Sequence, residues 1–295
     1  MFCFSGELQY NEYDNESYNE LQPFNSTSSS PSLLTELSSI SRGKDIYCWV
    51  CHHDGIDVSC KACPRGFHYK CIPSKASQSS SVHGSSSQGP THWICSECKS
   101  ILSAEEISPQ RQTLVSKLLV DELGLLLEFA LETIKASADP SFHKPVSQIV
   151  YPDYYKMIQH PMDISTIHKN IKARQYGCTQ AFLADIKWIV HNCIIYNDNS
   201  HPLTINAKYL SRVAKNETAE IEICPNCFKN FYTTKEQSTW FAEPCSSPHT
   251  LVYARVKGYP IWPAKAVRLG QHNDVDCRFF GTHDRFVCLF VILLQ

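Results

Sequence analysis

Cysteine and histidine residues between positions 48 and 98 fall into four closely spaced pairs. The pairs are Cys48–Cys51, Cys60–Cys63, His68–Cys71 and Cys95–Cys98. Thiolate sulfur and imidazole nitrogen are the ligands that tetrahedral zinc takes in proteins. A two-residue gap lets one turn of the chain direct both side chains of a pair at the same metal ion. Four such pairs therefore predict two zinc sites.

A second group of possible zinc ligands lies further along the chain. Cys224 and Cys227 form another pair, and Cys245 is followed four places later by His249. These residues predict a third zinc site; the alternative is a pair of exposed thiols in a linker. Structural zinc contributes about 10–16 kcal/mol to the folding of small loops. We therefore expect a small zinc ribbon at 221–250 that holds its neighbours in a fixed orientation.

The composition is typical of an intracellular protein with several small domains. The chain has 295 residues, fifteen cysteines and a net charge of −2. Its length predicts roughly two or three domains. The N-terminus lacks the charged and apolar regions of a secretory signal, so we expect metal ligands or buried thiols rather than disulfides. No run of roughly 18 apolar residues predicts a membrane span, and the net charge leaves DNA binding to a local basic patch.

Two segments have a polar, low-complexity composition. Residues 1–44 are rich in Ser, Asn, Tyr and acidic residues, and residues 74–90 are rich in Ser, Gln and Gly. We expect the first to be a disordered arm, because it has too few apolar residues to bury a core. The second is expected to be a flexible loop, whose closure cost grows only slowly with its length.

Apolar residues recur at three- and four-residue steps between positions 110 and 216, which predicts helices. The first stripe contains Leu118, Leu119, Leu123, Leu126, Leu127, Ala130 and Ile134. Three further helices are expected from Asp163 as an N-cap, from Thr179, and across the stripe Leu203, Ala207, Leu210 and Ala214. Four helices with a long first loop predict a left-handed four-helix bundle. By themselves the stripes indicate only a core.

The order of the first eight ligands, with Trp93 two places before the last pair, resembles the PHD finger, here at 45–100. A RING finger is the rival, but it usually carries its histidine one ligand earlier. The resemblance implies interleaved sites, with Cys48, Cys51, His68 and Cys71 on one ion and Cys60, Cys63, Cys95 and Cys98 on the other. It also implies binding of histone three. Readers of trimethyl-lysine in this family usually have a tryptophan where this chain has Gly66, so Asp54 and Asp57 are expected to contact an unmodified or monomethylated lysine.

Four motifs in the loops of the predicted bundle resemble the bromodomain, here at 110–216. They are FHKPV (142–146), PDYYKMI (152–158), HPMDISTI (160–167) and NCIIYN (192–197), while Pro140–Ser141 replaces the usual Trp-Pro. The resemblance implies an acetyl-lysine slot in which Asn197 donates to the acetyl carbonyl and Tyr154 holds a water. The slot walls would be Phe142, Val146, Tyr196 and Leu203. The alternatives are core packing for Tyr154 and Phe142, and a helix C-cap for Asn197.

The region 251–295 has the pattern of β-strands with a turn at Gly258. Its motif Pro260–Ile261–Trp262–Pro263 resembles the PWWP domain, a five-stranded barrel that binds methylated histone lysine and DNA. The resemblance implies a trimethyl-lysine cage of Tyr259, Trp262 and Phe279; a hydrophobic core is the alternative. A possible phosphate-facing patch consists of Arg255, Lys257, Lys265, Arg268, Arg278 and Arg285. Residues 286–295 depart from the family pattern, so we expect a partial barrel with an atypical or truncated end.

Taken in order, these modules resemble the chromatin-reader proteins of the MYND-type zinc-finger family, which includes the protein kinase C-binding protein. The family's MYND finger does not occur in this sequence. The resemblance implies a nuclear, non-catalytic reader in transcriptional regulation, with histone tails, nucleosomal DNA and corepressor or demethylase complexes as partners. The alternative is a zinc-finger ubiquitin or SUMO ligase or scaffold. No catalytic residues are predicted, since each expected zinc ion has four protein ligands and no position open for water.

Overall fold

The computed structural model describes residues 43–73, 93–106, 114–234, 239–270, 274–289 and 291–293. Nearly all of the predicted arm and the whole predicted loop at 74–90 lie outside these residues. Within the described residues, no helix has the length and apolar character needed to cross a membrane.

The first zinc segment has little regular structure. Strand β1 (Val58–Ser59) pairs antiparallel with β2 (Gly66–Phe67), a 3-10 helix covers Tyr69–Cys71, and α2 spans Ser96–Glu105. Its buried cluster consists of Phe67 and three cysteines, and the Trp93 ring packs on Phe67 at 4.9 Å. A core of this size is too small to fold a chain segment without a further constraint such as a metal ion.

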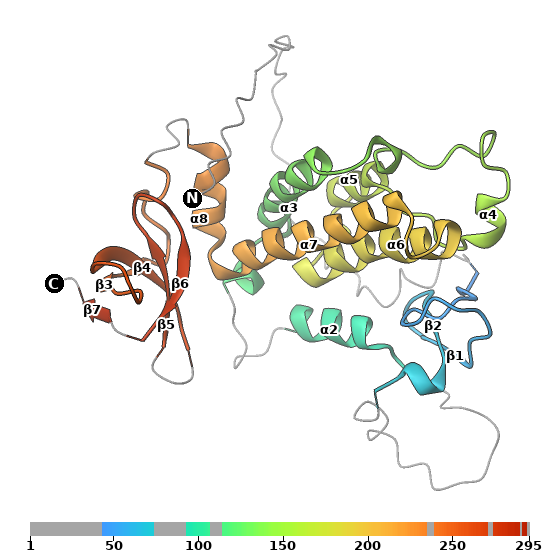
Figure 1. The fold of residues 1–295 in the computed structure, drawn as a ribbon, viewed down its shortest axis with the longest axis horizontal. Coiled ribbons are helices and arrows are strands. Elements are labelled where there is room, and N and C mark those ends of the chain that lie inside the picture. Colours follow the sequence, from blue (N-terminus) through green and yellow to red (C-terminus); the bar gives the residue numbers. More distant parts are fainter. Residues whose placement is uncertain are drawn as a thin grey trace, which may run out of the picture. The chain divides into compact units, whose positions relative to one another are not determined.

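Four long helices form the bundle at the centre of the chain (Figure 1). They are α3 (Val120–Ala136), α5 (Ile164–Lys172), α6 (Thr179–Asn197) and α7 (Pro202–Ile223), with the single turn α4 (Tyr154–Met157) in the long loop after α3. As predicted, Asp163 caps α5 by accepting a hydrogen bond from the backbone N–H of Thr166. The prediction that Leu119 belongs to the buried stripe is wrong. Leu119 is the N-cap of α3 and is 71% exposed.

The bundle continues beyond the end expected at residue 216. Helix α7 runs to Ile223, and α8 (Pro225–Thr233) follows at once. Tyr232 of α8 stacks on Phe129 of α3 at 5.1 Å, and its hydroxyl lies 2.7 Å from that of Thr133. The third zinc segment is therefore helical where a ribbon was expected: its described residues contain no strand before Thr250. Proline at the first helical position favours this helix start.

The C-terminal strands form one antiparallel sheet in the order β6-β5-β4-β3-β7 (Figure 1). Their bounds are Thr250–Ala254 (β3), Trp262–Leu269 (β4), Val275–Phe279 (β5), Arg285–Cys288 (β6) and Val291–Leu293 (β7). Gly258 has φ +87°, as the predicted turn between β3 and β4 requires. The atypical segment after residue 286 supplies β6 and β7, and β7 pairs with β3. Although this segment departs from the family pattern in sequence, it contributes the last two strands of a five-stranded sheet.

The zinc finger packs directly on helix α6, which the sequence did not predict. The rings of Trp49 and Trp188 meet at 4.7 Å, and the buried Arg65 guanidinium lies 4.2 Å and 4.9 Å from their centroids. Arg65 also donates to the carbonyl of Ala184 at 2.9 Å. Buried His191 donates from Nε2 to Asp45, 2.8 Å away, because a carboxylate can only accept. Finger and bundle therefore share a buried, hydrogen-bonded contact.

Candidate functional site

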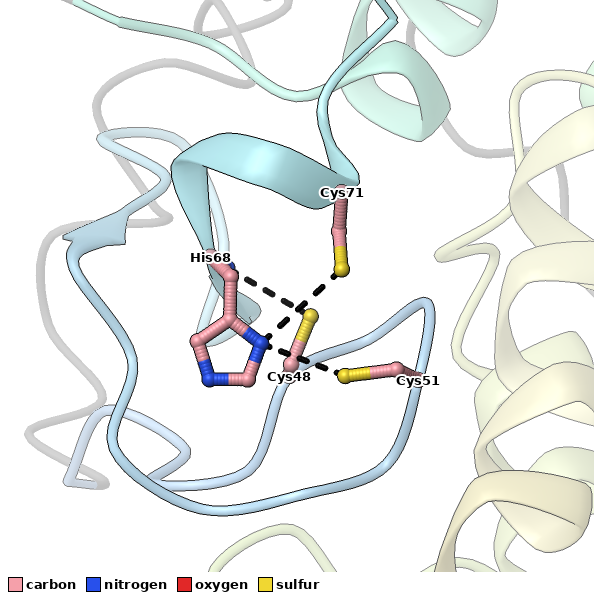
Figure 2. Close-up of side chains that lie close together, drawn as sticks. All are labelled: Cys48, Cys51, His68 and Cys71. Atoms are coloured by element: carbon pink, nitrogen blue, oxygen red, sulfur yellow. Dashed lines mark hydrogen bonds between the residues drawn. The ribbon is translucent and has the colours of Figure 1, made fainter.

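Cys48, Cys51, His68 and Cys71 come together around one point in the finger (Figure 2). Nδ1 of His68 lies 3.2 Å from the sulfur of Cys51 and 3.9 Å from that of Cys71. The other ring nitrogen, Nε2, lies 2.8 Å from the backbone carbonyl of Asp54, which can only accept. Nε2 therefore carries the proton, and Nδ1 keeps its lone pair for a metal ion.

The other two ligand sets are equally compact. Cys60, Cys63, Cys95 and Cys98 form the second, and Cys224, Cys227, Cys245 and His249 the third, with the ligand atoms of each set within 4.8 Å of one another. Neighbouring sulfurs are 3.4 to 3.9 Å apart. Four ligands at a zinc–sulfur distance of about 2.3 Å in a tetrahedron require about 3.8 Å between sulfurs. The grouping is the interleaved one expected from the sequence, and the donor sets fit zinc.

Local hydrogen bonds favour the thiolate form of some ligands, such as Cys48 and Cys224, whereas the pKa of other ligands in the same sets, such as Cys71 and Cys227, is raised. Although burial opposes ionisation, backbone N–H groups of Cys51, His68 and Val50 lower the pKa of Cys48 to about 7. In the third set, the hydrogen bond from the Cys227 thiol lowers the pKa of Cys224 to about 3. Cys95 and Cys224 each cap a helix, so the N–H groups of its first turn point at sulfur. Three sites with the chemistry of structural zinc confirm the predicted cofactor.

The residues of the expected acetyl-lysine slot come from the bundle end where α6 meets the long loop. Tyr154 of α4 is buried and packs against Tyr196 at 5.0 Å, and the Tyr196 hydroxyl donates to Asp153 at 3.1 Å. Burial raises the pKa of Tyr154, so its hydroxyl keeps its proton. Phe142 is buried in the bundle core, against which Leu203 packs. Val146 is half-buried, and its carbonyl accepts from Tyr155.

Asn197 is the last residue of α6 and does not cap it. The following residue, Asp198, has a positive φ (+75°), and its side chain closes the turn by accepting hydrogen bonds from the backbone N–H groups of Ser200 and His201. Burial raises the pKa of the Cys193 thiol, one turn earlier, and the side chain of Asn197 offsets part of this rise. The C-cap alternative is thus removed, and the Asn197 amide remains half-buried beside Tyr196.

Tyr259, Trp262 and Phe279 line one cavity of about 230 Å³ in the C-terminal sheet. We call it the aromatic cavity; its other walls are Val256, Pro260, Thr282, Asp284 and Phe286. Trp262 is 52% exposed, so it is a surface wall rather than a core residue. Its indole Nε1 donates to the carbonyl of Phe280 at 2.9 Å, which fixes the ring. The sequence analysis did not predict Asp284 and Phe286 as walls of this cavity. The spacing of Phe279 and Phe286 on either side of a Gly-Thr turn could have indicated that both rings lie at the same site.

Three of the six residues in the predicted basic patch are engaged within the chain. Arg278 and Arg285 pair with Glu220 of α7 at 2.8 and 2.9 Å. Lys265 is 5% exposed, with its ammonium 4.5 Å from the Phe241 ring centroid. The patch is therefore smaller than predicted: the exposed cations outside these contacts are Arg255, Lys257 and Arg268.

The two acidic residues expected to contact a histone lysine, Asp54 and Asp57, differ in whether other hydrogen bonds already engage them. One oxygen of Asp57 accepts a hydrogen bond from the backbone of Tyr69 at 2.9 Å, so Asp57 also has a structural role. Asp54 is exposed at the edge of the ligand loop. A Cβ at Gly66 would lie 2.8 Å from the carbonyl of Asp45, so an aromatic wall at this position would collide with the backbone.

Comparison with known proteins agrees with this geometry. Residues 126–209 match the family model of the bromodomain. The chain is a bromodomain protein related to the MYND-type chromatin readers. Over 245 residues, 82% of its length, it is 34% identical to the MYND-type zinc finger-containing chromatin reader Zmynd8 of Drosophila melanogaster. This match confirms the resemblance and includes residues outside the bromodomain.

Weaker similarity connects the bromodomain chain to two further proteins. It is 26% identical over 59% of its length to the E3 ubiquitin-protein ligase TRIM33 of Danio rerio. It is 31% identical over 48% of its length to the transcription initiation factor TFIID subunit 1 of Drosophila melanogaster. The matched region covers 14%, 15% and 7% of these three relatives, so the activities of the whole proteins are not transferred to this chain.

Proposed function

We propose that this chain is a non-catalytic chromatin reader in the nucleus that binds acetylated and methylated histone tails, together with DNA, in transcriptional regulation. The bromodomain match and the half-buried amide of Asn197 at the end of α6 carry the proposal. Acetylation removes the lysine charge, so an apolar slot with one amide donor accepts the modified side chain and rejects the cation.

The other modules add further contacts to the same chromatin ligand. The finger offers Asp54, and in part Asp57, to the ammonium of an unmodified or monomethylated lysine near the N-terminus of histone three. The aromatic cavity offers three rings to a methylated ammonium. Arg255 and Lys257 lie a few residues from Tyr259 and supply cations for a nearby phosphate. Modules on one chain raise one another's effective concentration, so a nucleosome is the expected ligand rather than one peptide.

Replacing Asn197 by alanine should abolish measurable binding of acetylated histone peptides. The acetyl carbonyl then loses its donor, which costs about 1–3 kcal/mol, or about 5- to 150-fold in affinity. Isothermal titration calorimetry measures the loss, and circular dichroism checks that the helices are unchanged. Asn199→Ala, in the exposed loop just after α6, is the matched control and should bind like the parent chain. Undiminished binding by Asn197→Ala would show that the slot is not used.

Replacing Trp262 by alanine should weaken binding of a trimethyl-lysine histone peptide by about 2- to 30-fold, since one cation–π contact contributes about 0.5–2 kcal/mol. Tyr253→Ala is the control, because Tyr253 is 41% exposed and alternates with buried Val252 and Ala254, which places it on the opposite face of the sheet. Fluorescence anisotropy of a labelled peptide measures both variants. Equal affinities for the two would exclude the aromatic cavity as the methyl-lysine site.

A ubiquitin or SUMO ligase is the competing class, because one relative is named a ligase. The match covers 15% of that protein, so it does not transfer the activity. The contact with α6 also covers one face of the finger, where Arg65 is buried and Trp49 is half-buried, so this face is not open to a conjugating enzyme. A ubiquitin-discharge assay with the whole chain tests the alternative, and accelerated discharge would support it.

A further inference from the structure

The turn between β5 and β6 presents its side chains to two different neighbours. Phe279, Thr282 and Asp284 line the aromatic cavity. Phe280 and His283, from the same turn, instead contact the segment that carries the last two ligands of the third zinc site. We call this segment, residues 239–249, the zinc loop. One turn thus connects the cavity with the metal ligands.

The contact with the zinc loop is aromatic and buried. Trp240 and Phe241 are 4% and 1% exposed and belong to the same cluster as Cys224, Cys227 and Cys245. Their rings lie 4.8 and 5.2 Å from that of His283, and Phe241 lies 4.9 Å from Phe280. Movement of the zinc loop would therefore remove the packing partner of the turn.

The same turn fixes the main wall of the cavity. The backbone carbonyl of Phe280 accepts a hydrogen bond from the indole N–H of Trp262 at 2.9 Å. The backbone N–H of Phe280 donates to the carbonyl of Pro263 at 3.1 Å. Within this turn, His283 has φ +60°, a conformation that costs energy for a residue with a Cβ, whereas Gly281 adopts φ +92° freely. A non-glycine residue in the left-handed region persists only when surrounding packing holds it there.

We propose that the third zinc site supports the aromatic cavity from outside: its four ligands, when bound to zinc, hold the zinc loop against Phe280 and His283 and so set the position of Trp262. Trp240, Phe241, Phe280 and His283 are positioning residues in this arrangement and do not contact the ligand. The identity of that ligand as methyl-lysine rests on the proposed function, but the structural coupling does not.

Two variants of the whole 295-residue chain separate the effect of the metal from that of the ring contact. Cys245→Ser should lower the zinc content from three ions to two in native mass spectrometry. His283→Asn should keep three ions, because it removes only the imidazole, and asparagine tolerates a positive φ. His168→Asn, exposed on α5, is the matched control. Each chain is prepared with 5-fluorotryptophan, and Trp262→Phe assigns the Trp262 resonance.

The fluorine signal of Trp262 should shift or broaden in Cys245→Ser and His283→Asn and stay unchanged in His168→Asn. Affinity for a trimethyl-lysine peptide should fall about tenfold in Cys245→Ser and less in His283→Asn, while acetyl-peptide binding is retained. A parent-like Trp262 signal in Cys245→Ser, with one zinc ion lost, would overturn the coupling. If the parent chain binds no methylated peptide, the proposed ligand is wrong, and the fluorine signal still decides the coupling.

Discussion

Native mass spectrometry is expected to find three zinc ions per chain, and their removal is expected to unfold the finger and the third site. Twelve ligands in three compact sets carry this prediction. Because the small buried cluster of each segment consists largely of the zinc ligands themselves, each segment depends on the about 10–16 kcal/mol that structural zinc supplies. The bundle should survive chelation, since its core consists of fully buried aliphatic and aromatic side chains such as Leu127, Phe182 and Trp188.

Circular dichroism and proteolysis after treatment with a strong chelator measure this outcome. Helical signal should be largely retained, while the finger becomes sensitive to protease. Cys60→Ser and Cys224→Ser should each lose one ion, whereas Cys178→Ser should keep all three, because the Cys178 thiol lies beside Glu105 and outside the ligand sets. Two ions in the parent chain, or no loss in Cys224→Ser, would contradict the assignment.

Replacing Arg65 by alanine should detach the finger from the bundle and destabilise the chain by about 2.5–7 kcal/mol. Two cation–π contacts contribute about 0.5–2 kcal/mol each, and a buried hydrogen bond from a charged donor about 1.5–3 kcal/mol. The substitution also leaves the carbonyl of Ala184 without this donor and opens space between Trp49 and Trp188.

Urea unfolding and hydrogen exchange of the α6 amides test this contact. Lys70→Ala removes an exposed cation from the same finger and should change stability by less than about 0.5 kcal/mol. In Arg65→Ala, exchange near Ala184 and His191 should increase, whereas the zinc content should stay at three. A variant as stable as the parent, with protected α6 amides, would mean that Arg65 does not hold the two parts together.

The local features of this chain could be predicted from its sequence. The Cys-x2-Cys spacing, the helical stripes, the Asp163 cap and the turn at Gly258 each depend on residues within a few positions of one another. Such short-range patterns specify local geometry directly, because one helical turn or one tight turn determines where the side chains point. Leu119 is the exception within the stripes, since periodicity does not show where a helix begins.

Only the tertiary structure decided how these local pieces meet. Asp45 and His191 are separated by 146 positions, and Arg65 and Ala184 by 119, so no local period connects them. For the same reason, Lys265, Arg278 and Arg285 looked like free surface cations in the sequence, although Glu220 and the zinc loop engage them. The sequence by itself determined the ligand pairs and the helices that bear the bromodomain motifs, and the family resemblance implied how the first four pairs interleave. The tertiary structure determined which charges are internal, how the finger is anchored, and that the third zinc site supports a wall of the aromatic cavity, because each depends on contacts between distant segments.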